Sequence, residues 1–243
     1  MLLPRPEYAV HKAWMYRLLI AIADQQLLSG SLRFKGGTCA AMRGFLDRFS
    51  VDLDFDLVLP ENNKAVQKEL EKIFKKAGLI IKDKSSALPQ YFLKYPSQTD
   101  QRNTIKLEAV FPVPVNNAYE PVRFNDIDRI LYCHTLETMF SNKLVSLLDR
   151  YDKHRSIAGR DLYDIHTFLI KGYSFNPDII TERRQTDLET FFSELIAFIE
   201  EKITQTIINQ DLNYLLPNNA FQQIRKSLKQ EVIMLLKDRV ELI

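Results

Sequence analysis

Residues 51–59 read VDLDFDLVL, and this stretch decides the fold that the sequence predicts. Apolar and polar residues alternate with a period of two, which is typical of a β-strand with one buried face. The leucine and phenylalanine side chains share the predicted buried face, so Asp52, Asp54 and Asp56 share the other. Like charges this close raise each other's pKa unless a cation lies between them. We therefore expect a positive group or a metal ion on the aspartate face.

Carboxylate oxygens are the ligands that Mg²⁺ prefers, and Mg²⁺ usually binds together with substrate phosphates. Asp52 and Asp54 are therefore candidate ligands for Mg²⁺ or Mn²⁺. Taken alone, the Asp-Leu-Asp pattern is more often a solvated strand edge than a metal site. Its neighbourhood decides between the two interpretations.

The segment upstream, FKGGT at residues 34–38, predicts a strand, a glycine turn and the start of a helix. We expect the strand over 32–35 and a helix that Thr38 caps and that runs to about residue 47. A glycine turn before a helix exposes backbone N–H groups, which bind phosphate. A plain strand–helix connection is the alternative. On the other side, Ser50 adds a hydroxyl beside the aspartates, and Arg48 can pair with a carboxylate or a phosphate.

The pattern along the rest of the chain predicts two domains. Helices are expected over 8–28 and 62–76, and further strands over 79–82, 90–95 and 103–111. Beyond residue 135 the pattern is helical, over 135–150, 161–171, 177–204 with a break, and 219–241. We therefore predict an α+β domain on a small mixed sheet over residues 1–130, and a helical domain over residues 131–243.

Polar residues recur at two places in the predicted helical domain. Lys143 falls inside the apolar stripe of the helix over 135–150, which is explained either by a stem that lies along a helix edge or by a phosphate partner. Asp161 and Asp164 lie on one side of the next helix. Asp161 alone is also consistent with a charge that stabilises a helix N-terminus.

Composition excludes several classes of protein. The chain has 243 residues, 33 Lys and Arg against 31 Asp and Glu, and two cysteines. A net charge of +2 permits a nucleic-acid partner without predicting one, and two isolated cysteines form no disulfide framework. No apolar run is long enough to span a membrane, so we expect a cytoplasmic protein.

The motifs also resemble those of a known family. Residues 35–38 (KGGT) and 47–55 (DRFSVDLDF) resemble the GGT…RxSxDLDF signature of the AbiEii/AbiGii-type nucleotidyltransferases. These are toxins of abortive-infection and type IV toxin–antitoxin systems, related to the mycobacterial MenT toxins and distantly to the polymerase-β superfamily. Lys143 and the later RDLYDI at residues 160–165 are similar to the family's second block. The resemblance covers about residues 10–175.

The resemblance implies a nucleotidyltransferase-like N-terminal domain, Mg²⁺-dependent transfer from an NTP, and an active-site cleft that the helical domain completes. Asp52 and Asp54 would bind the metal, Glu108 would be a third carboxylate, and Asp164 or Asp161 would act from the second block. The residues that would bind the NTP are Lys35, Gly36, Gly37, Thr38, Arg48, Ser50 and Lys143.

The resemblance further implies the 3′ end of a tRNA as acceptor, a block of translation, and a cognate antitoxin as partner. A protein acceptor is the alternative within this activity. Two other functions stay open from the sequence: a nucleotide-binding regulator that transfers nothing, and an RNA- or protein-interaction module.

Overall fold

A computed structural model describes residues 1–96 and 102–241 of the chain. It divides into two compact units, each of which is described by itself. The first unit comprises Met1–Gly44, Phe49–Val113 and Tyr119–His134. The second comprises Phe45–Arg48, Pro114–Ala118 and Thr135–Ile243.

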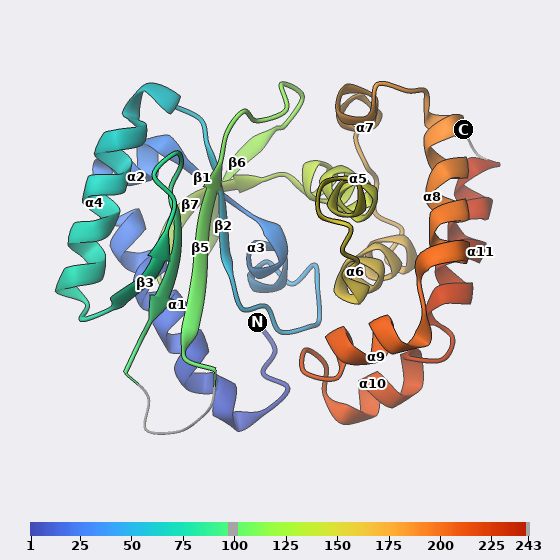
Figure 1. The fold of residues 1–243 in the computed structure, drawn as a ribbon, viewed down its shortest axis with the longest axis horizontal. Helices are drawn as coiled ribbons and strands as arrows, with labels where there is room; N and C mark the ends of the chain where they lie inside the picture. The colour runs from blue at the N-terminus through green and yellow to red at the C-terminus, as the bar shows by residue number, and fades with distance from the viewer. Residues whose placement is uncertain (97–101, 242–243) are drawn as a thin grey trace. The chain divides into compact units, whose positions relative to one another are not determined.

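A mixed sheet forms the centre of the first unit (Figure 1). Within the described residues it has seven strands in the order β3-β4-β5-β2-β1-β7-β6. Strand β2 lies in the middle, antiparallel to β1 and parallel to β5. The strands are β1 Leu32–Lys35, β2 Leu53–Leu57, β3 Ile80–Lys84, β4 Gln90–Lys94, β5 Thr104–Val110, β6 Tyr119–Phe124 and β7 Arg129–His134. The predicted α+β class with a mixed sheet is confirmed.

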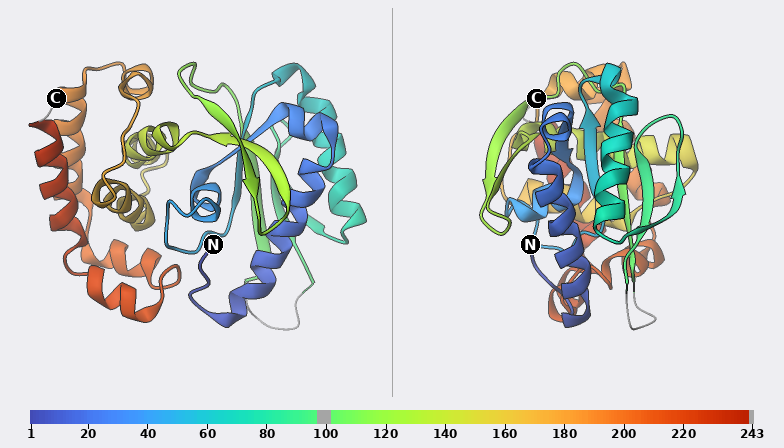
Figure 2. Two further views of the ribbon diagram at one scale, coloured as in Figure 1. Left: turned by 180° about the vertical axis from the view of Figure 1, so that it is seen from behind. Right: turned by 90° about the vertical axis from the view of Figure 1, so that its left-hand side faces the viewer.

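Helices cover both faces of this sheet. Figures 1 and 2 show α1, α2 and α4 on one face and α3 on the other. Leu53, Phe55 and Leu57 of β2 are at most 1% exposed, as the alternating pattern predicts, so the even-numbered residues of β2 point to the opposite face. The helical segments are η1 Pro6–Tyr8, α1 Ala9–Ala23, α2 Gln26–Ser31, α3 Gly36–Met42, η2 Pro60–Asn62 and α4 Asn63–Lys76.

The second unit is helical throughout its described elements. Helix α5 packs against α6 and α7, α6 also packs against α9, and α11 packs against α6 and α8. The helices are α5 Leu136–His154, α6 Gly159–Ile170, α7 Pro177–Arg184, α8 Leu188–Lys202, α9 Gln205–Leu212, α10 Asn218–Ile224 and α11 Leu228–Val240. Within the described part of the chain, no helix is both long and apolar enough to cross a membrane.

The largest differences between the observed helices and the expected ones are at three places. The helix predicted over 8–28 is two helices that meet at Asp24 and Gln25, and the one predicted over 219–241 breaks between α10 and α11. The prediction that Thr38 caps α3 is wrong, because the helix begins at Gly36 and ends at Met42. The Thr38 hydroxyl instead donates to the backbone carbonyl of Asp52.

The hairpin of β6 and β7 was not predicted. Its strands pair over Tyr119–Phe124 and Arg129–His134, but the alternation is obscured because the apolar Ile130 and Tyr132 are about half exposed or more. Pro121 also argues against a strand, and it is tolerated here because β6 lies at the edge of the sheet.

Candidate active site

The turn between β1 and α3 lies directly against the acidic strand. Gly36 has a φ of +75°, and a Cβ atom at this position would collide with the Asp54 carboxylate and lie 3.0 Å from the Asp54 Cβ. Only glycine fits this close approach without strain. The Thr38 hydroxyl, in the first turn of α3, donates to the backbone carbonyl of Asp52. The two predicted groups, glycine turn and aspartates, are therefore neighbours in the fold.

Asp52 and Asp54 form a pair of carboxylates that no lysine, arginine or histidine among the described residues pairs with. Among residues 1–96 and 102–241, no side chain or backbone group donates a hydrogen bond to the Asp54 carboxylate, and no ion pair reaches either aspartate. Burial, followed by the negative charge of Asp52, raises the pKa of Asp54 to about 6. A cation at this pair would relieve that electrostatic cost.

Glu108 lies at the register position of Asp54 on the neighbouring parallel strand β5. Its carboxylate is engaged on both oxygens, because Lys106 Nζ donates at 2.6 Å and Gln90 Nε2 donates at 2.5 Å. Glu108 therefore belongs to the same face of the sheet as Asp54, and Lys106 balances its charge.

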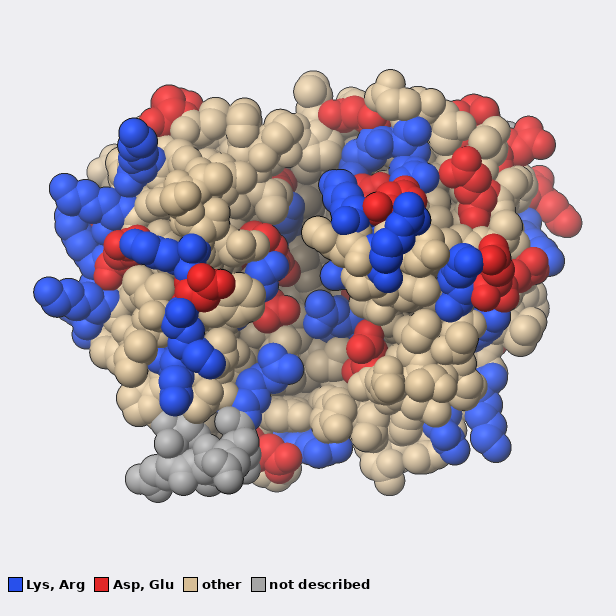
Figure 3. Space-filling view, in the orientation of Figure 1, with Lys and Arg blue, Asp and Glu red and all other residues tan. Residues whose placement is uncertain are grey.

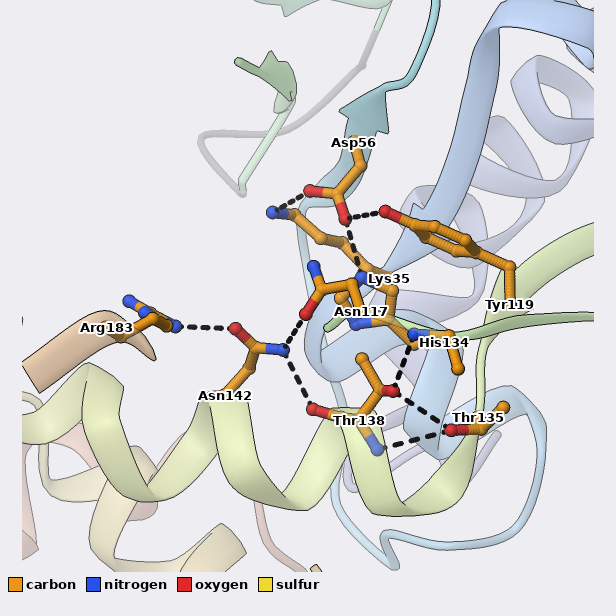
Figure 4. Close-up of polar contacts among 10 residues, drawn as sticks. Lys35, Asp56, Asn117, Tyr119, His134, Thr135, Thr138, Asn142 and Arg183 are labelled. Atoms are coloured by element: carbon orange, nitrogen blue, oxygen red, sulfur yellow. Dashed lines mark hydrogen bonds and ion pairs between the residues drawn. The ribbon is translucent and has the colours of Figure 1, made fainter. Parts of the chain in front are cut away.

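Asp56, the third aspartate of the strand, is fully buried and surrounded by donors. Lys35 Nζ lies 2.5 Å from Oδ1, while the Tyr119 hydroxyl and His134 Nε2 lie 2.8 and 2.7 Å from Oδ2. Figure 4 shows these side chains pointing at Asp56 from β1, β6 and β7. Burial alone would raise the pKa of Asp56, but the His134 hydrogen bond and the Lys35 charge hold it well below its usual value.

Two partners of Asp56, Tyr119 and His134, were not predicted from the sequence. Both lie on the β6–β7 hairpin, and no motif in the sequence marks that hairpin. Two further predicted residues of the first unit are buried: Gly37 lies in α3, and Ser50 is 8% exposed.

The donor set of the first unit fits a divalent cation that binds together with phosphate. Within the described residues, no group of three or more His, Cys, Asp or Glu side chains gathers as a metal site. Mg²⁺ does not require such a cage, since one or two carboxylates with substrate phosphates and water complete its octahedron. Asp52 and Asp54 supply two such carboxylates.

In the second unit, five charged side chains form one network, in which Arg48, Asp161 and Asp164 are buried. Lys143 Nζ lies 2.9 Å from both Asp161 Oδ1 and Asp164 Oδ2. Arg48 is 2% exposed and donates to both oxygens of Asp164, and Arg150 Nε reaches Asp161 at 3.1 Å. The predicted Lys143 and both candidate aspartates are thus brought together, and Arg48, for which a carboxylate or a phosphate was expected, pairs with a carboxylate.

Electrostatics favour the charged forms of Lys143 and Asp161. Burial alone lowers the pKa of Lys143, but the charges of Asp161 and Asp164 outweigh it and raise the pKa above its ordinary value. Burial likewise opposes ionisation of Asp161, yet Lys143 and Arg150 bring its pKa well below the usual range. The ammonium is therefore held in one place as a permanent positive charge.

A second polar chain in this unit was not predicted either. Asn142 on α5 donates to Asn117 and to the Thr138 carbonyl, and accepts from Arg183 on α7 (Figure 4). No motif marks these residues in the sequence, because asparagine and threonine at these spacings are common on any helix surface.

Comparison with known proteins gives matches over most of the chain. Residues 17–233 match the family model described as nucleotidyl transferase AbiEii toxin, type IV TA system. A proposed nucleotidyltransferase from H. pylori is similar with a TM-score of 0.63 and 19% identity, over 98% of this chain and 97% of that chain. MenT4, a nucleotidyltransferase toxin from Mycobacterium tuberculosis H37Rv, is similar with a TM-score of 0.50 and 16% identity, over 96% and 86% of the two chains. No curated protein sequence matches.

Proposed function

This chain belongs to the AbiEii family of nucleotidyl transferase toxins of type IV toxin–antitoxin systems, and we propose from that premise that it transfers a nucleotide from an NTP to the 3′ end of a tRNA in a reaction that requires Mg²⁺ or Mn²⁺. Such a modification would block aminoacylation and therefore translation. Because tRNA and NTPs are cytoplasmic, the proposed reaction is a cytoplasmic one. The type IV toxin–antitoxin family implies a cognate antitoxin as partner.

One observation carries the metal dependence. Three aspartates at β2 and Glu108 on β5 give four neighbouring carboxylates. Two of them have a lysine partner: Lys35 pairs with Asp56, and Lys106 pairs with Glu108. Asp52 and Asp54 remain, with a combined charge of −2 when both are ionised. That charge matches one divalent cation, which Asp52 and Asp54 would hold and which would neutralise negative charge on the triphosphate and the departing pyrophosphate.

The reaction exchanges one phosphorus–oxygen bond for another. The acceptor hydroxyl attacks the α-phosphorus of the NTP, the α–β bridge breaks, and pyrophosphate leaves. Glu108 is the proposed acceptor of the hydroxyl proton, at the register position of Asp54. The turn at Gly36, Gly37 and Thr38 is proposed to bind phosphate through backbone N–H groups, with the Ser50 hydroxyl beside it.

Lys143 of the second unit is proposed to neutralise the triphosphate. Asp161 and Asp164 hold its ammonium at 2.9 Å each, and Arg48 in turn fixes Asp164. Phosphoryl transfer depends mainly on positioning and electrostatic stabilisation, so this network would act by presenting a charge of fixed orientation. Asp161 and Asp164 then contribute through Lys143, whether or not either contacts the nucleotide.

A labelling experiment tests the proposed activity. Purified protein is incubated with each α-³²P-labelled NTP, Mg²⁺ and total RNA, with EDTA and the Asp54→Asn variant as controls. We expect label on tRNA that depends on the divalent cation and is lost in the variant. Label on protein alone would support a protein acceptor, and NTP binding without transfer would support a nucleotide-binding regulator.

The acceptor surface is proposed to include the end of α5. Lys153, His154 and Arg155 are exposed there, and Arg150 joins this segment to Asp161. Figure 3 shows Lys and Arg side chains, with acidic ones among them, over α5 and α7. Clustered cations bind a nucleic-acid backbone through counterion release.

The double variant Lys153→Gln/Arg155→Gln tests this surface. Its matched control is Lys68→Gln/Lys75→Gln, which removes two charges from exposed positions of α4 in the other unit. We expect the first pair to weaken tRNA binding and to reduce the slope of log K against log salt by about 1.5, while the control binds like the wild type. Equal effects of both pairs would contradict a specific surface on α5.

A further inference from the structure

Lys35 has two carboxylates within reach on its side of the sheet. It lies directly opposite Asp54 in the antiparallel pair of β1 and β2, and diagonal to Asp56, which is opposite Arg33. Directly opposite side chains on one face have Cβ atoms about 5 Å apart, and diagonal ones about 7–8 Å. By position alone, Asp54 is therefore the nearer partner for the lysine.

The ammonium nevertheless lies on the more distant carboxylate. Lys35 Nζ is 2.5 Å from Asp56 Oδ1 and makes no ion pair with Asp54 within the described residues. The lysine side chain crosses the strand pair diagonally to reach its partner, as Figure 4 shows. The surroundings of Asp56 must therefore make it a more favourable partner for the lysine than the nearer Asp54.

The surroundings of Asp56 supply that preference. Its carboxylate is fully buried, whereas Asp54 is partly exposed, and an ion pair is stronger where water is excluded. Tyr119 and His134 fix the carboxylate by donating to Oδ2, which leaves Oδ1 turned toward the lysine. Tyr119 and His134 therefore hold the Asp56 carboxylate in the orientation in which Oδ1 accepts from Lys35.

We propose that Asp56 is a positioning residue, which holds the Lys35 ammonium away from Asp52 and Asp54 and so keeps that pair of carboxylates open to a divalent cation. This inference rests on the proposed metal-dependent function. Without Asp56, Lys35 would turn to Asp54, its nearest carboxylate, and would act as a built-in competitor of the metal. The third aspartate of the strand therefore serves the metal site without being a ligand.

Metal affinity of the protein without nucleotide tests the proposal, because a merely structural role of Asp56 would not depend on Lys35. Mn²⁺ affinity is measured by isothermal titration calorimetry on the wild type, Asp56→Asn, Lys35→Met and the double variant that combines the two substitutions. We expect Asp56→Asn to bind Mn²⁺ at least about tenfold more weakly, since a cation then faces the pair. The double variant should return to within about threefold of the wild type, because the competitor is gone.

Two outcomes would overturn the proposal: wild-type affinity in a folded Asp56→Asn variant, or a double variant as weak as Asp56→Asn. Asp56→Glu keeps the charge and should bind Mn²⁺ like the wild type; a tenfold loss in this variant, if folded, also contradicts the proposal. Far-ultraviolet circular dichroism establishes that each variant is folded.

If Asp56→Asn does not fold, Lys35→Met decides alone. A lysine already held away from the pair has little effect on the metal, so this variant should bind within about threefold of the wild type. An affinity that rises or falls tenfold would contradict the proposal. Mn²⁺ binding that does not change in Asp54→Asn would instead overturn the proposed metal site itself, together with this inference.

Discussion

Asp54 is the residue at which the fold leaves a charge unbalanced. Its carboxylate lies against Gly36, beside Asp52 and opposite Lys35, yet none of the described residues donates to it. The pKa of about 6, which burial and the charge of Asp52 produce, means that the folded protein binds a proton more tightly than the unfolded chain.

This shift predicts how stability depends on pH. Between about pH 4 and pH 6 the folded state binds more protons at Asp54, so the free energy of unfolding falls as the pH rises. The contribution is about 1–3 kcal/mol. Urea unfolding at pH 4.5 and pH 7.5 should show a smaller pH dependence in Asp54→Asn than in the wild type. Asp83→Asn, on the exposed β3, is the control; a pH dependence that Asp54→Asn leaves unchanged would contradict the assignment.

Arg48 and Asp164 predict a strong coupling in the second unit. Each is at most 2% exposed, so removing either one leaves the other as a buried charge with fewer partners. We expect Arg48→Met or Asp164→Leu alone to lower the free energy of unfolding by about 3–5 kcal/mol. The double variant should lose clearly less than the sum. Strict additivity in urea unfolding would mean that the two side chains do not interact.

At the scale of elements, the turn between β1 and α3 carries the sharpest constraint. Gly36 and Gly44 flank the same helix, and both have positive φ angles, +75° and +78°. Of these two glycines, Gly36 lacks room for a Cβ atom because Asp54 occupies that space, whereas nothing lies within 4 Å at Gly44.

The two glycines therefore form a matched pair of variants. Gly44→Ala should cost about 1 kcal/mol of stability through backbone strain alone. Gly36→Ala should cost more, and should also abolish nucleotide transfer, because the new methyl group displaces the Asp54 carboxylate. Thermal unfolding and the labelling assay measure both effects. Equal losses in the two variants would show that the close approach of Gly36 to Asp54 has no role.

The elements also show what can be predicted from this sequence. Strand β2 was predictable because its alternation is strict, and its apolar residues are at most 1% exposed. The β6–β7 hairpin was not, because Ile130 and Tyr132 are exposed where the period-two pattern expects polar residues. The Asp56 cluster depends on that hairpin, so its partners Tyr119 and His134 could not be assigned. Lys143 was found because a lysine interrupts an apolar stripe.

At the scale of the whole molecule, positive and negative side chains are nearly equal in number but are clustered in different segments. The net charge of +2 conceals an acidic strand in the first unit and a basic segment at the end of α5 in the second. Family membership establishes a nucleotidyl transferase toxin. The central claim is that the Asp52–Asp54 pair is required for nucleotide transfer.

Mass spectrometry of tRNA tests that claim most directly. RNA is isolated from cells that express the wild type or Asp54→Asn at equal protein levels, and the 3′ ends of the tRNAs are sequenced by mass. We predict added nucleotides at the 3′ end in wild-type cells, of a defined base, and unmodified ends with normal growth in cells with the variant. Identical additions in both cultures, or growth arrest by the variant, would contradict the account.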